Sequence, residues 1–471
     1  MMISKSIKSQ FEAIVGKENI MTSQAQRLVY SYDATPNMQA MPDLILAPRS
    51  TQEVIEIVNV CRGEKIPIVP RGSGSNLCAG TVPIAGGVVL LFKHMNQILE
   101  VDEENLTVTV QPGVITQDLI EAVERRGLFY PPDPSSMKIS TIGGNINENS
   151  GGLRGLKYGV TADYVMGLEA VLANGEVIHT GGKLAKDVAG YNLTQLLVGS
   201  EGTLAIITEA TLKLIPMPES KKTMLALYEN IDAAAQSVSK IIAAQMIPAT
   251  LEFLDQPTLQ AVEDFSQIGL PTDVEAVLLI EQDGPEEVVA RDIEKMALIC
   301  TETGAVSVQI AATIEEAEAL TTARRAALSA LARLKPTTIL EDATVPRSEI
   351  ANMVKAINEI AEKHQVKICT FGHAGDGNLH PTCPTDARDE DEMARVEAAF
   401  ADIFDQAIRL GGTITGEHGV GIVKAPYLEW KVGAAGIAVM KGIKQALDPQ
   451  QILNPGKVFS EETRNRLVVS T

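Results

Sequence analysis

The sequence predicts an α+β protein that folds into more than one domain. Helical and extended patterns alternate in the first part of the chain, where a helix at 50–61 lies between short apolar strands. At 471 residues the chain is too long for a single hydrophobic core. The segment Pro216-Met217-Pro218 interrupts the strand pattern and marks a domain boundary.

In the first part, capping residues and apolar spacing predict the individual elements. Ser50-Thr-Gln-Glu53 is a capping box that opens a helix. The strands are predicted at 66–69, 87–91, 106–110, 167–172, 177–180 and 204–214, with a second helix at 116–126. The apolar face of the first helix consists of Val54, Ile57, Val58 and Cys61. The glycine- and asparagine-rich passage from Thr141 to Gly152 is predicted to be structureless, which inside a compact domain indicates function.

Beyond the boundary, helical patterns dominate. They lie at 233–244, 285–301 and 313–334, the last one opened by Thr313-Ile-Glu-Glu316. The tail at 447–457 is predicted to be a single helical turn followed by a stop.

Composition excludes several classes of function. The net charge of −20 argues against nucleic acid and against anionic membrane surfaces as partners. The five cysteines form no Cys-x-x-Cys pair, so they indicate a reducing compartment and supply no iron–sulfur cluster. No apolar run approaches the roughly eighteen residues of a transmembrane segment. These observations predict a cytoplasmic protein whose only membrane contact is peripheral, through partners.

Two short glycine-framed segments hold three of the six histidines. They are Gly-His373-Ala-Gly-Asp-Gly-Asn-Leu-His380 and Gly-Glu417-His418-Gly. The Asp-Gly signal predicts a hairpin whose six-residue loop brings the imidazoles of His373 and His380 face to face. With Glu417 they make two histidines and a carboxylate, a set suited to a divalent metal with open coordination positions. The alternative is that they are satisfied histidines at glycine-rich strand ends.

The glycine-rich loop Arg71-Gly-Ser-Gly-Ser-Asn76 follows a predicted strand and offers backbone N–H donors to a phosphate. It is not a Rossmann fingerprint, because Leu77 stands at the third glycine, and it is not a Walker loop. Close backbone approaches are also predicted at 141–147, 150–152 and 199–206, as a long dinucleotide between two subdomains would need. The alternative is that these glycines serve bulges and turns.

Arg324 lies on the apolar stripe of the predicted helix at 313–334, with Leu320, Ala327, Leu328 and Leu331, whereas Arg325 points elsewhere. A guanidinium on a buried face usually answers an anion. Arg324 is therefore the predicted partner of a substrate carboxylate, and the alternative is that its side chain extends to solvent.

The motifs resemble, in their order, the FAD-linked D-2-hydroxyacid dehydrogenases of the vanillyl-alcohol oxidase type, in particular glycolate oxidase catalytic subunits and D-lactate dehydrogenases. The resemblance covers roughly residues 40–460. The motifs are Pro-Arg-Gly-Ser-Gly-Ser, Pro-Pro-Asp-Pro-Ser, Thr-Ile-Gly-Gly-Asn, Gly-Ser-Glu-Gly-Thr-Leu, the two histidine segments and Leu-Asn-Pro-Gly-Lys.

This resemblance implies a particular domain architecture. Residues 1–218 would form a FAD-binding domain with two lobes, at about 40–110 and 111–218. Residues 219–425 would form an α+β cap domain that holds the metal site and a large antiparallel sheet. Residues 426–471 would return to the FAD domain.

The same resemblance implies which residues hold FAD. The pyrophosphate would lie against Arg71, Gly72, Ser73, Gly74, Ser75 and Asn76. The rest of the cofactor would be lined by Pro132, Asp133, Ser136, Thr141, Gly143, Gly144, Asn147, Ser150, Gly151, Glu201, Gly202, Ile206 and Asn454. FAD is expected to be non-covalent, because Ser75 and Asn76 stand where covalent members of the family carry a histidine.

The expected activity is oxidation of a short D-2-hydroxy acid, D-lactate or glycolate, to the 2-keto acid. His373, His380 and Glu417 match the metal ligands of related enzymes, for Zn, Mn or Fe. His418 would act as base, and Asn378 would contribute a hydrogen bond. Leu340 replaces a lysine of the D-2-hydroxyglutarate dehydrogenases, which favours a monocarboxylate.

The expected electron acceptor is an electron-transferring flavoprotein, an iron–sulfur subunit or a quinone. Three alternatives stay open at this point. They are a D-2-hydroxyglutarate dehydrogenase, a redox-neutral enzyme like the alkyl-dihydroxyacetone-phosphate synthases, and a non-catalytic flavin scaffold subunit.

Overall fold

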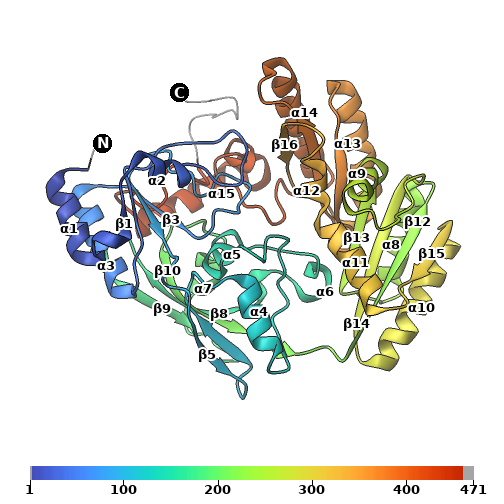
Figure 1. The fold of residues 1–471 in the computed structure, drawn as a ribbon, viewed down its shortest axis with the longest axis horizontal. Coiled ribbons are helices and arrows are strands. Elements are labelled where there is room, and N and C mark those ends of the chain that lie inside the picture. Colours follow the sequence, from blue (N-terminus) through green and yellow to red (C-terminus); the bar gives the residue numbers. More distant parts are fainter. Residues whose placement is uncertain (1–2, 460–471) are drawn as a thin grey trace. The chain divides into compact units, whose positions relative to one another are not determined.

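The computed structural model describes residues 3–459, and its chain forms two compact units (Figure 1). Within the described residues, the N-terminal unit comprises 3–150, 160–217 and 417–459. The C-terminal unit comprises 151–159 and 218–416. The chain passes between the units inside the Pro216-Met217-Pro218 segment and returns at Glu417, ahead of the boundary expected at 426.

The first sheet of the N-terminal unit has the strand order β1-β2-β4-β3. Its strands are β1 (Ile20–Met21), β2 (Leu44–Leu46), β4 (Val88–Leu91) and β3 (Ile68–Arg71), and the last three are parallel. Helix α3 (Thr51–Glu64) begins where predicted, with Ser50 as its N-cap, and buries Val54, Ile57, Val58 and Cys61. Helices α1 (Lys5–Val15) and α2 (Gln24–Val29) precede it, and α1 packs against α3.

The second sheet of this unit is antiparallel, with the order β5-β6-β10-β8-β9. Its strands are β5 (Ile98–Asp102), β6 (Thr107–Val110), β10 (Ile206–Lys213), β8 (Val165–Val171) and β9 (Val177–Gly181). Helices α4 (Thr116–Glu124) and α7 (Leu193–Leu197) accompany it, and a short pair joins β7 (Leu128–Phe129) to β11 (Ile215–Pro216).

The passage at 141–152, predicted to be structureless, contains helix α5 (Ile142–Glu148), so that prediction was wrong. Thr141 caps the helix, because its Oγ1 accepts a hydrogen bond from Gly144 N at 3.2 Å. The glycines serve close packing: a Cβ at Gly143 would lie 2.6 Å from the Cβ of Pro112. Glycine therefore reflects a crowded helix at this point, and not an irregular loop.

The C-terminal unit is built on an eight-stranded sheet with the order β15-β12-β14-β13-β18-β19-β16, in which β17 also pairs with β19. Every pairing in it is antiparallel, which confirms the predicted large antiparallel sheet. The strands are β12 (Ser220–Tyr228), β13 (Thr250–Asp255), β14 (Ala276–Gly284), β15 (Ser307–Ile310), β16 (Thr337–Leu340), β17 (Ala343–Thr344), β18 (Cys369–His373) and β19 (Asn378–Thr385).

Helices of the C-terminal unit pack against this sheet and against each other, as in the contacts of α10 with β12 and of α13 with α14 (Figure 1). They are α6 (Gly155–Tyr158), α8 (Ile231–Ala243), α9 (Gln256–Ser266), α10 (Glu286–Glu302), α11 (Ile314–Arg325), α12 (Ala327–Leu331), α13 (Ile350–His364) and α14 (Glu390–Arg409). The single helix predicted at 313–334 is two helices, α11 and α12, separated at Ala326.

The third segment of the N-terminal unit contains α15 (Leu428–Leu447), which was not predicted; the single helical turn was expected at 447–457, where α15 has already ended. Gly433, with φ of 70°, interrupts the helix, so its apolar residues do not follow one continuous period. After α15 the chain reaches the first sheet, where Ile68 N donates to Ile452 O at 2.7 Å. No helix within residues 3–459, α14 and α15 included, has the length and apolar character needed to cross a bilayer.

Candidate active site

The two candidate metal-binding histidines lie on a hairpin of the C-terminal unit. Strands β18 and β19 pair so that His373 is opposite Asn378, and His380 is opposite Phe371. The ring centroids of His373 and His380 are 5.0 Å apart at an interplanar angle of 88°. The predicted face-to-face arrangement was therefore wrong, because the histidines are diagonal neighbours whose rings meet edge to face. The connecting loop is Ala374–Gly377, shorter than the predicted six residues.

Glycine is required at the turn of this hairpin. Gly377 has φ of 88°, and its N–H donates to His373 O at 3.0 Å. A Cβ at this position would lie 2.0 Å from the carbonyl oxygen of Val345. The Asp-Gly signal thus located the turn correctly, since no other residue type fits the backbone there.

Asn378 lies on the same face of the sheet as the two histidines, at the start of β19. Its Oδ1 accepts a hydrogen bond from Thr344 Oγ1 at 3.0 Å. This bond occupies the carbonyl oxygen and leaves the Nδ2 of Asn378 as the donor for a ligand.

The chain that leads to Glu417 is held firmly within the C-terminal unit. Asp342, fully buried, accepts from Thr415 Oγ1 at 3.0 Å and from Gly416 N at 2.6 Å. A Cβ at Gly416 would lie 2.3 Å from Thr344 Oγ1, so the chain passes close beside β17. Glu417 and His418 follow directly, with His418 Nε2 3.8 Å from Glu417 Oε1. Asp342 was missed in the sequence, where it is the second of two consecutive acidic residues after a short strand.

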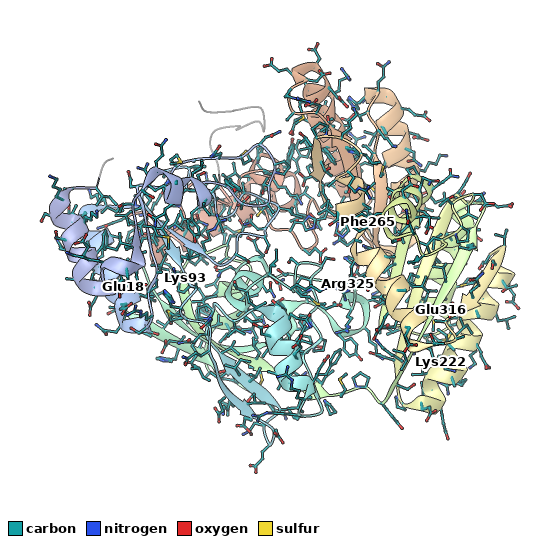
Figure 2. The ribbon with its side chains drawn as sticks, viewed as in Figure 1. Glu18, Lys93, Lys222, Phe265, Glu316 and Arg325 are labelled. Atoms are coloured by element: carbon teal, nitrogen blue, oxygen red, sulfur yellow. The ribbon has the colours of Figure 1, made fainter. Side chains whose placement is uncertain are left out.

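Arg324 is buried on α11, with 3% of its surface exposed, whereas the adjacent Arg325 is only half-buried (Figure 2). Its guanidinium lies 4.8 Å above the ring of Phe371. Its Nη2 forms an ion pair with Glu252 Oε2 at 2.5 Å, and its Nε has no hydrogen-bond partner among the described residues. A buried guanidinium with an unused donor is suited to an additional anion.

Glu252, on β13, is a residue that the sequence analysis missed. It is fully buried, and its Oε1 lies 2.7 Å from His373 Nδ1. Burial raises the pKa of this carboxyl group, but the charges of Arg324 and His373 outweigh that effect and hold it below its ordinary value. The available signal was a glutamate between the apolar residues Leu251 and Phe253.

Leu340 occupies the position at which, by the resemblance, the D-2-hydroxyglutarate dehydrogenases carry a lysine. It lies on β16 opposite Thr382, two residues along β19 from His380 and on the same face. This register position carries an aliphatic side chain with 8% of its surface exposed, so it offers no cation to a ligand.

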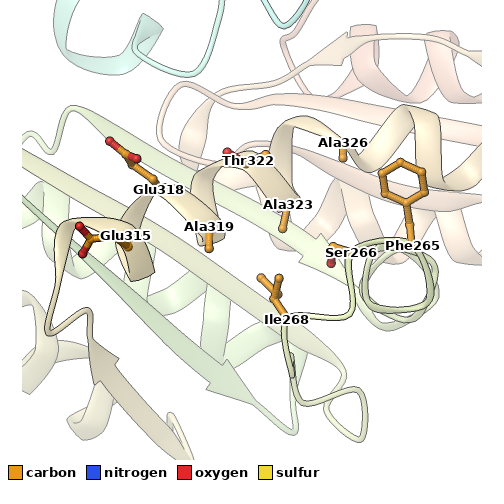
Figure 3. A pocket seen from close by; sticks show the side chains of 9 residues that line it. All are labelled: Phe265, Ser266, Ile268, Glu315, Glu318, Ala319, Thr322, Ala323 and Ala326. Atoms are coloured by element: carbon orange, nitrogen blue, oxygen red, sulfur yellow. The ribbon is translucent and has the colours of Figure 1, made fainter.

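A hollow of the C-terminal unit does not coincide with these residues. It has a volume of about 490 Å³ and lies between α11 and the end of α9, beside Phe265, Ile268 and Ala319 (Figure 3). None of its nine lining residues is a histidine, cysteine, lysine or arginine, so it offers no cation to an anionic ligand.

In the N-terminal unit, the loop after β3 presents backbone donors. The N–H groups of residues 73–77 have no acceptor among the described residues. A Cβ at Gly72 would lie 2.1 Å from Thr141 Oγ1, so the loop runs directly over the start of α5. Such a nest of N–H groups fits a pyrophosphate.

Arg71 is committed to the interior of this loop. Its Nη1 donates to Tyr32 O at 2.8 Å and to Thr81 Oγ1 at 3.3 Å, and burial lowers its pKa. A Cβ at Gly74 would lie 2.2 Å from Arg71 Nη2. The side chain therefore supports the conformation of the loop from within, and the donors nearest to a ligand are the backbone N–H groups.

The structure brings several of the predicted FAD residues together. Asn147 Nδ2 donates to Gly143 O at 2.7 Å, and its Oδ1 accepts from Gly202 N at 2.9 Å. Asn454 Nδ2 donates to Gly80 O at 2.9 Å and to Glu201 O at 2.7 Å. Helix α5, the turn at 201–202 and the chain end are thus tied to the loop that follows β3.

The remaining predicted FAD residues are more dispersed. Ile206 is buried in β10, and Ser150 O accepts from Thr161 N at 3.1 Å. Pro132, Asp133 and Ser136 belong to a segment that is bonded to the start of α4. Thr116 N donates to Ser140 O, and Gln117 N donates to Met137 O. Gly151 belongs to the C-terminal unit.

Two carboxylates, one buried and one half-buried, meet a buried thiol in the N-terminal unit, and the sequence singled out only one of them. Candidate ligand atoms of Cys78, Glu148 and Glu201 lie within 4.8 Å of one another. Burial and the neighbouring Glu201 raise the pKa of Glu148 well above its ordinary value, and burial also raises the pKa of Glu201. Glu201 still accepts hydrogen bonds from Val420 N and Gly421 N, both at 2.7 Å. Such a pair of carboxylates favours a shared proton.

The whole fold has a counterpart among solved structures. It matches 4-ethylphenol oxidase from Gulosibacter chungangensis with a TM-score of 0.78 at 20% identity, over 98% of this chain and 99% of that one. This similarity shows that the chain shares the fold of that oxidase, which confirms the predicted fold class.

Family models and sequence relatives give the narrower identity. Residues 42–181 match the FAD binding domain, and residues 217–458 match the C-terminal domain of FAD linked oxidases. The chain is 72% identical to the glycolate oxidase subunit GlcD of Bacillus subtilis (strain 168) over 99% of both chains. It is 38% identical to the D-lactate dehydrogenase of Anaerostipes hadrus, over 89% of this chain and 90% of that one. The chain belongs to the FAD-linked oxidase family, and FAD is confirmed as its cofactor.

Proposed function

We propose that this FAD-linked oxidoreductase oxidises a short D-2-hydroxy acid, D-lactate or glycolate, to the 2-keto acid and passes the electrons to a separate acceptor. The names of the relatives support this substrate class. The observation that carries the proposal is the buried guanidinium of Arg324: its Nε has no hydrogen-bond partner among the described residues, and it lies over Phe371 on the strand that carries His373. A small carboxylic acid next to potential metal ligands is the ligand that this combination fits best.

His373, His380 and Glu417 are the proposed ligands of a divalent metal, Zn, Mn or Fe. The edge-to-face pair of imidazoles and the anchoring of Gly416 by Asp342 support this assignment. A divalent cation, when bound, lowers the pKa of the substrate hydroxyl group. Two histidines and one carboxylate leave coordination positions open for the hydroxyl and one carboxylate oxygen of the substrate.

The protein side chains then have separate roles. Arg324 binds the substrate carboxylate, and Asn378 Nδ2 donates a hydrogen bond to the substrate. His418 removes the hydroxyl proton. The hydrogen on C2 would leave with its electron pair as hydride, for which FAD, when bound, would supply the acceptor, and the product would be the 2-keto acid. Leu340 offers no second cation, which favours a monocarboxylate over D-2-hydroxyglutarate.

The backbone donors of residues 73–77 are proposed to hold the pyrophosphate of non-covalent FAD. Electrons leave the flavin to an electron-transferring flavoprotein, an iron–sulfur subunit or a quinone. The relative named as a subunit supports an acceptor outside this chain. All five cysteines are free, buried thiols, in agreement with that division of labour.

Anaerobic bleaching of the flavin absorbance tests the reaction directly. We expect D-lactate or glycolate to bleach the flavin, and D-2-hydroxyglutarate and L-lactate to do so far more slowly. Faster bleaching by D-2-hydroxyglutarate would reassign the substrate. No bleaching by any 2-hydroxy acid would point to a redox-neutral enzyme or a flavin scaffold.

Arg324→Ala tests the carboxylate site. We expect KM for the preferred acid to rise by roughly 10- to 100-fold, because a charged hydrogen bond worth about 1.5–3 kcal/mol is lost. Arg325→Ala is the matched control, since it removes the same charge from the next position of α11, and its KM should be unchanged. Equal effects of the two variants would remove Arg324 from the site.

A further inference from the structure

One buried carboxylate joins the candidate metal ligand to the candidate carboxylate-binding cation. Glu252 uses Oε1 for His373 Nδ1, at 2.7 Å, and Oε2 for Arg324 Nη2, at 2.5 Å. All three residues lie in the C-terminal unit, and the side chains of Glu252, Arg324 and His373 are 0%, 3% and 6% exposed. Each oxygen of the carboxylate therefore has its own cationic or hydrogen-bonding partner.

The sheet register sets this arrangement. Strands β13 and β18 pair with Phe253 opposite Gly372 and Leu254 opposite Phe371, so one further step brings Glu252 beside His373 on the same face. Arg324 reaches this point from α11 across the ring of Phe371, 4.8 Å from its guanidinium. Two strands and one helix thus converge on a single acidic side chain.

A buried carboxylate is unsuitable where a side chain has only to fill space in the core. An unpaired charge in such a place is strongly destabilising, and an apolar residue of the same volume is often tolerated as well or better. Glu252 also contacts two candidate ligand-binding groups, His373 and Arg324, whereas a structural ion pair needs only one partner. The contact therefore indicates a role for the charge in the orientation of these two groups.

The contact with His373 has a defined chemical consequence. A carboxylate beside Nδ1 retains the proton on that nitrogen and leaves the lone pair of Nε2 for a metal. The contact with Arg324 fixes one edge of the guanidinium and leaves Nε as its unused donor. The same carboxylate thereby selects which atom of each partner remains for a ligand.

We propose that Glu252 is a positioning residue that presents His373 Nε2 to the metal and Arg324 Nε to the substrate carboxylate. This inference rests on the proposed function, because it assigns a purpose to the same two groups. It predicts that metal binding and binding of the acid both weaken when one oxygen of Glu252 is replaced, although Glu252 touches neither ligand.

Glu252→Gln in the flavin-loaded protein tests the proposal. We expect Zn²⁺ affinity, measured by competition with a chelator, to fall by roughly 10- to 100-fold, as for other residues that orient metal ligands. KM should rise as well, and the flavin content should stay unchanged. Glu281→Gln is the matched control: Glu281 lies on the same sheet, opposite Thr250, and its Oε2 accepts from Thr223 Oγ1 at 3.3 Å. Its Zn²⁺ affinity should equal that of the unsubstituted protein.

Two further measurements separate positioning from a merely structural role. In a His373→Ala background, Glu252→Gln should cause no further loss of Zn²⁺ affinity, because the effect passes through that histidine. In the metal-free protein, ¹⁵N spectra of labelled histidine should show His373 protonated at Nδ1, and Glu252→Gln should shift the tautomer population. Glu252→Asp, which keeps the charge, should recover part of the Zn²⁺ affinity.

The outcomes distinguish this inference from the proposed function. If the unsubstituted protein and the Glu252→Gln variant bind Zn²⁺ with equal affinity, and the tautomer of His373 is unchanged, the inference alone is overturned. Failure of the unsubstituted protein to bind Zn²⁺, Mn²⁺ or Fe²⁺ would overturn the metal site and the inference with it. Additive losses in the double variant would show that Glu252 acts by general stability.

Discussion

At the scale of single residues, the buried carboxyl group of Asp255 links the stability of the protein to pH. It ends β13 and caps α9, because its Oδ1 accepts from Thr258 N at 2.9 Å. Its Oδ2 accepts from Thr370 N at 2.6 Å. Burial outweighs these hydrogen bonds and raises the pKa of Asp255 from 3.8 to about 6.

This shift predicts a dependence of stability on pH. The folded protein holds the Asp255 proton more tightly than the unfolded chain, so the contribution is full below pH 4 and is lost as the pH rises to about 6. The difference amounts to roughly 3 kcal/mol at most. Asp255→Asn should remove this decline, which chemical unfolding between pH 4 and 7 would reveal as a flatter curve. Parallel curves for the two proteins would contradict the assignment.

Single residues also show what the sequence can and cannot reveal about the site. His373 and His380 were found because glycine-framed histidines are rare in this chain, and Arg324 because it interrupts an apolar stripe. Glu252 was not found, because its two partners lie on other elements, far away in the chain. A residue defined by long-range contacts leaves no local periodicity.

At the scale of elements, α5 determines how closely the chain can approach the loop after β3. Gly143 N donates to Pro112 O at 2.8 Å, and this glycine has no room for a side chain. The same segment carries Thr141, which touches the loop, and Asn147, which holds the turn at 201–202. A shift of this short helix would therefore disturb the proposed FAD site at several points.

Two glycine-to-alanine substitutions in helices should have opposite effects. Gly143→Ala forces overlap with Pro112 and should destabilise by about 1–3 kcal/mol, with weaker FAD retention. Gly63→Ala in α3, where a Cβ meets nothing within 4 Å, should stabilise by about 0.5–1 kcal/mol through helix propensity. Thermal unfolding and the ratio of flavin to protein absorbance provide the measurements. A neutral Gly143→Ala would show that α5 can move without cost.

Helix α3, which has a regular apolar pattern and an N-cap, was predicted well, whereas α5 and α15 were not. The cap and buried face of α3 agree with the structure residue by residue. The sequence pattern missed α5 because glycine lowers helix propensity, whereas tertiary packing against Pro112 decides the outcome. Helix α15 was missed because Gly433 breaks its period.

At the scale of the whole molecule, the N-terminal unit depends on residues from the far end of the chain. Asn454, buried and at φ of 40°, donates to Gly80 O and Glu201 O. The backbone of Val420 and Gly421 donates to the carboxylate of Glu201. These contacts close the unit around the segments proposed to bind FAD.

Asn454→Ala should therefore weaken FAD binding although Asn454 is remote in sequence from every glycine loop. Two buried carbonyl groups lose their donor, at a cost of roughly 2–4 kcal/mol in total. Titration of the apoprotein with FAD, followed by flavin fluorescence, measures the effect. Asn105→Ala, at an exposed turn, is the control. Equal FAD affinity in both variants would contradict the closing role of Asn454.

The three-segment construction of the N-terminal unit has a consequence for folding during translation. Strand β3 receives its neighbour at 452–454 only after nearly the whole polypeptide has left the ribosome. The stretch 218–416 emerges earlier and contains every strand of its own sheet. The part of the chain that is able to fold first is thus encoded in the second half of the message, whereas the nascent N-terminal half has to wait. A polypeptide truncated before residue 417 would therefore have a first half that cannot complete its fold.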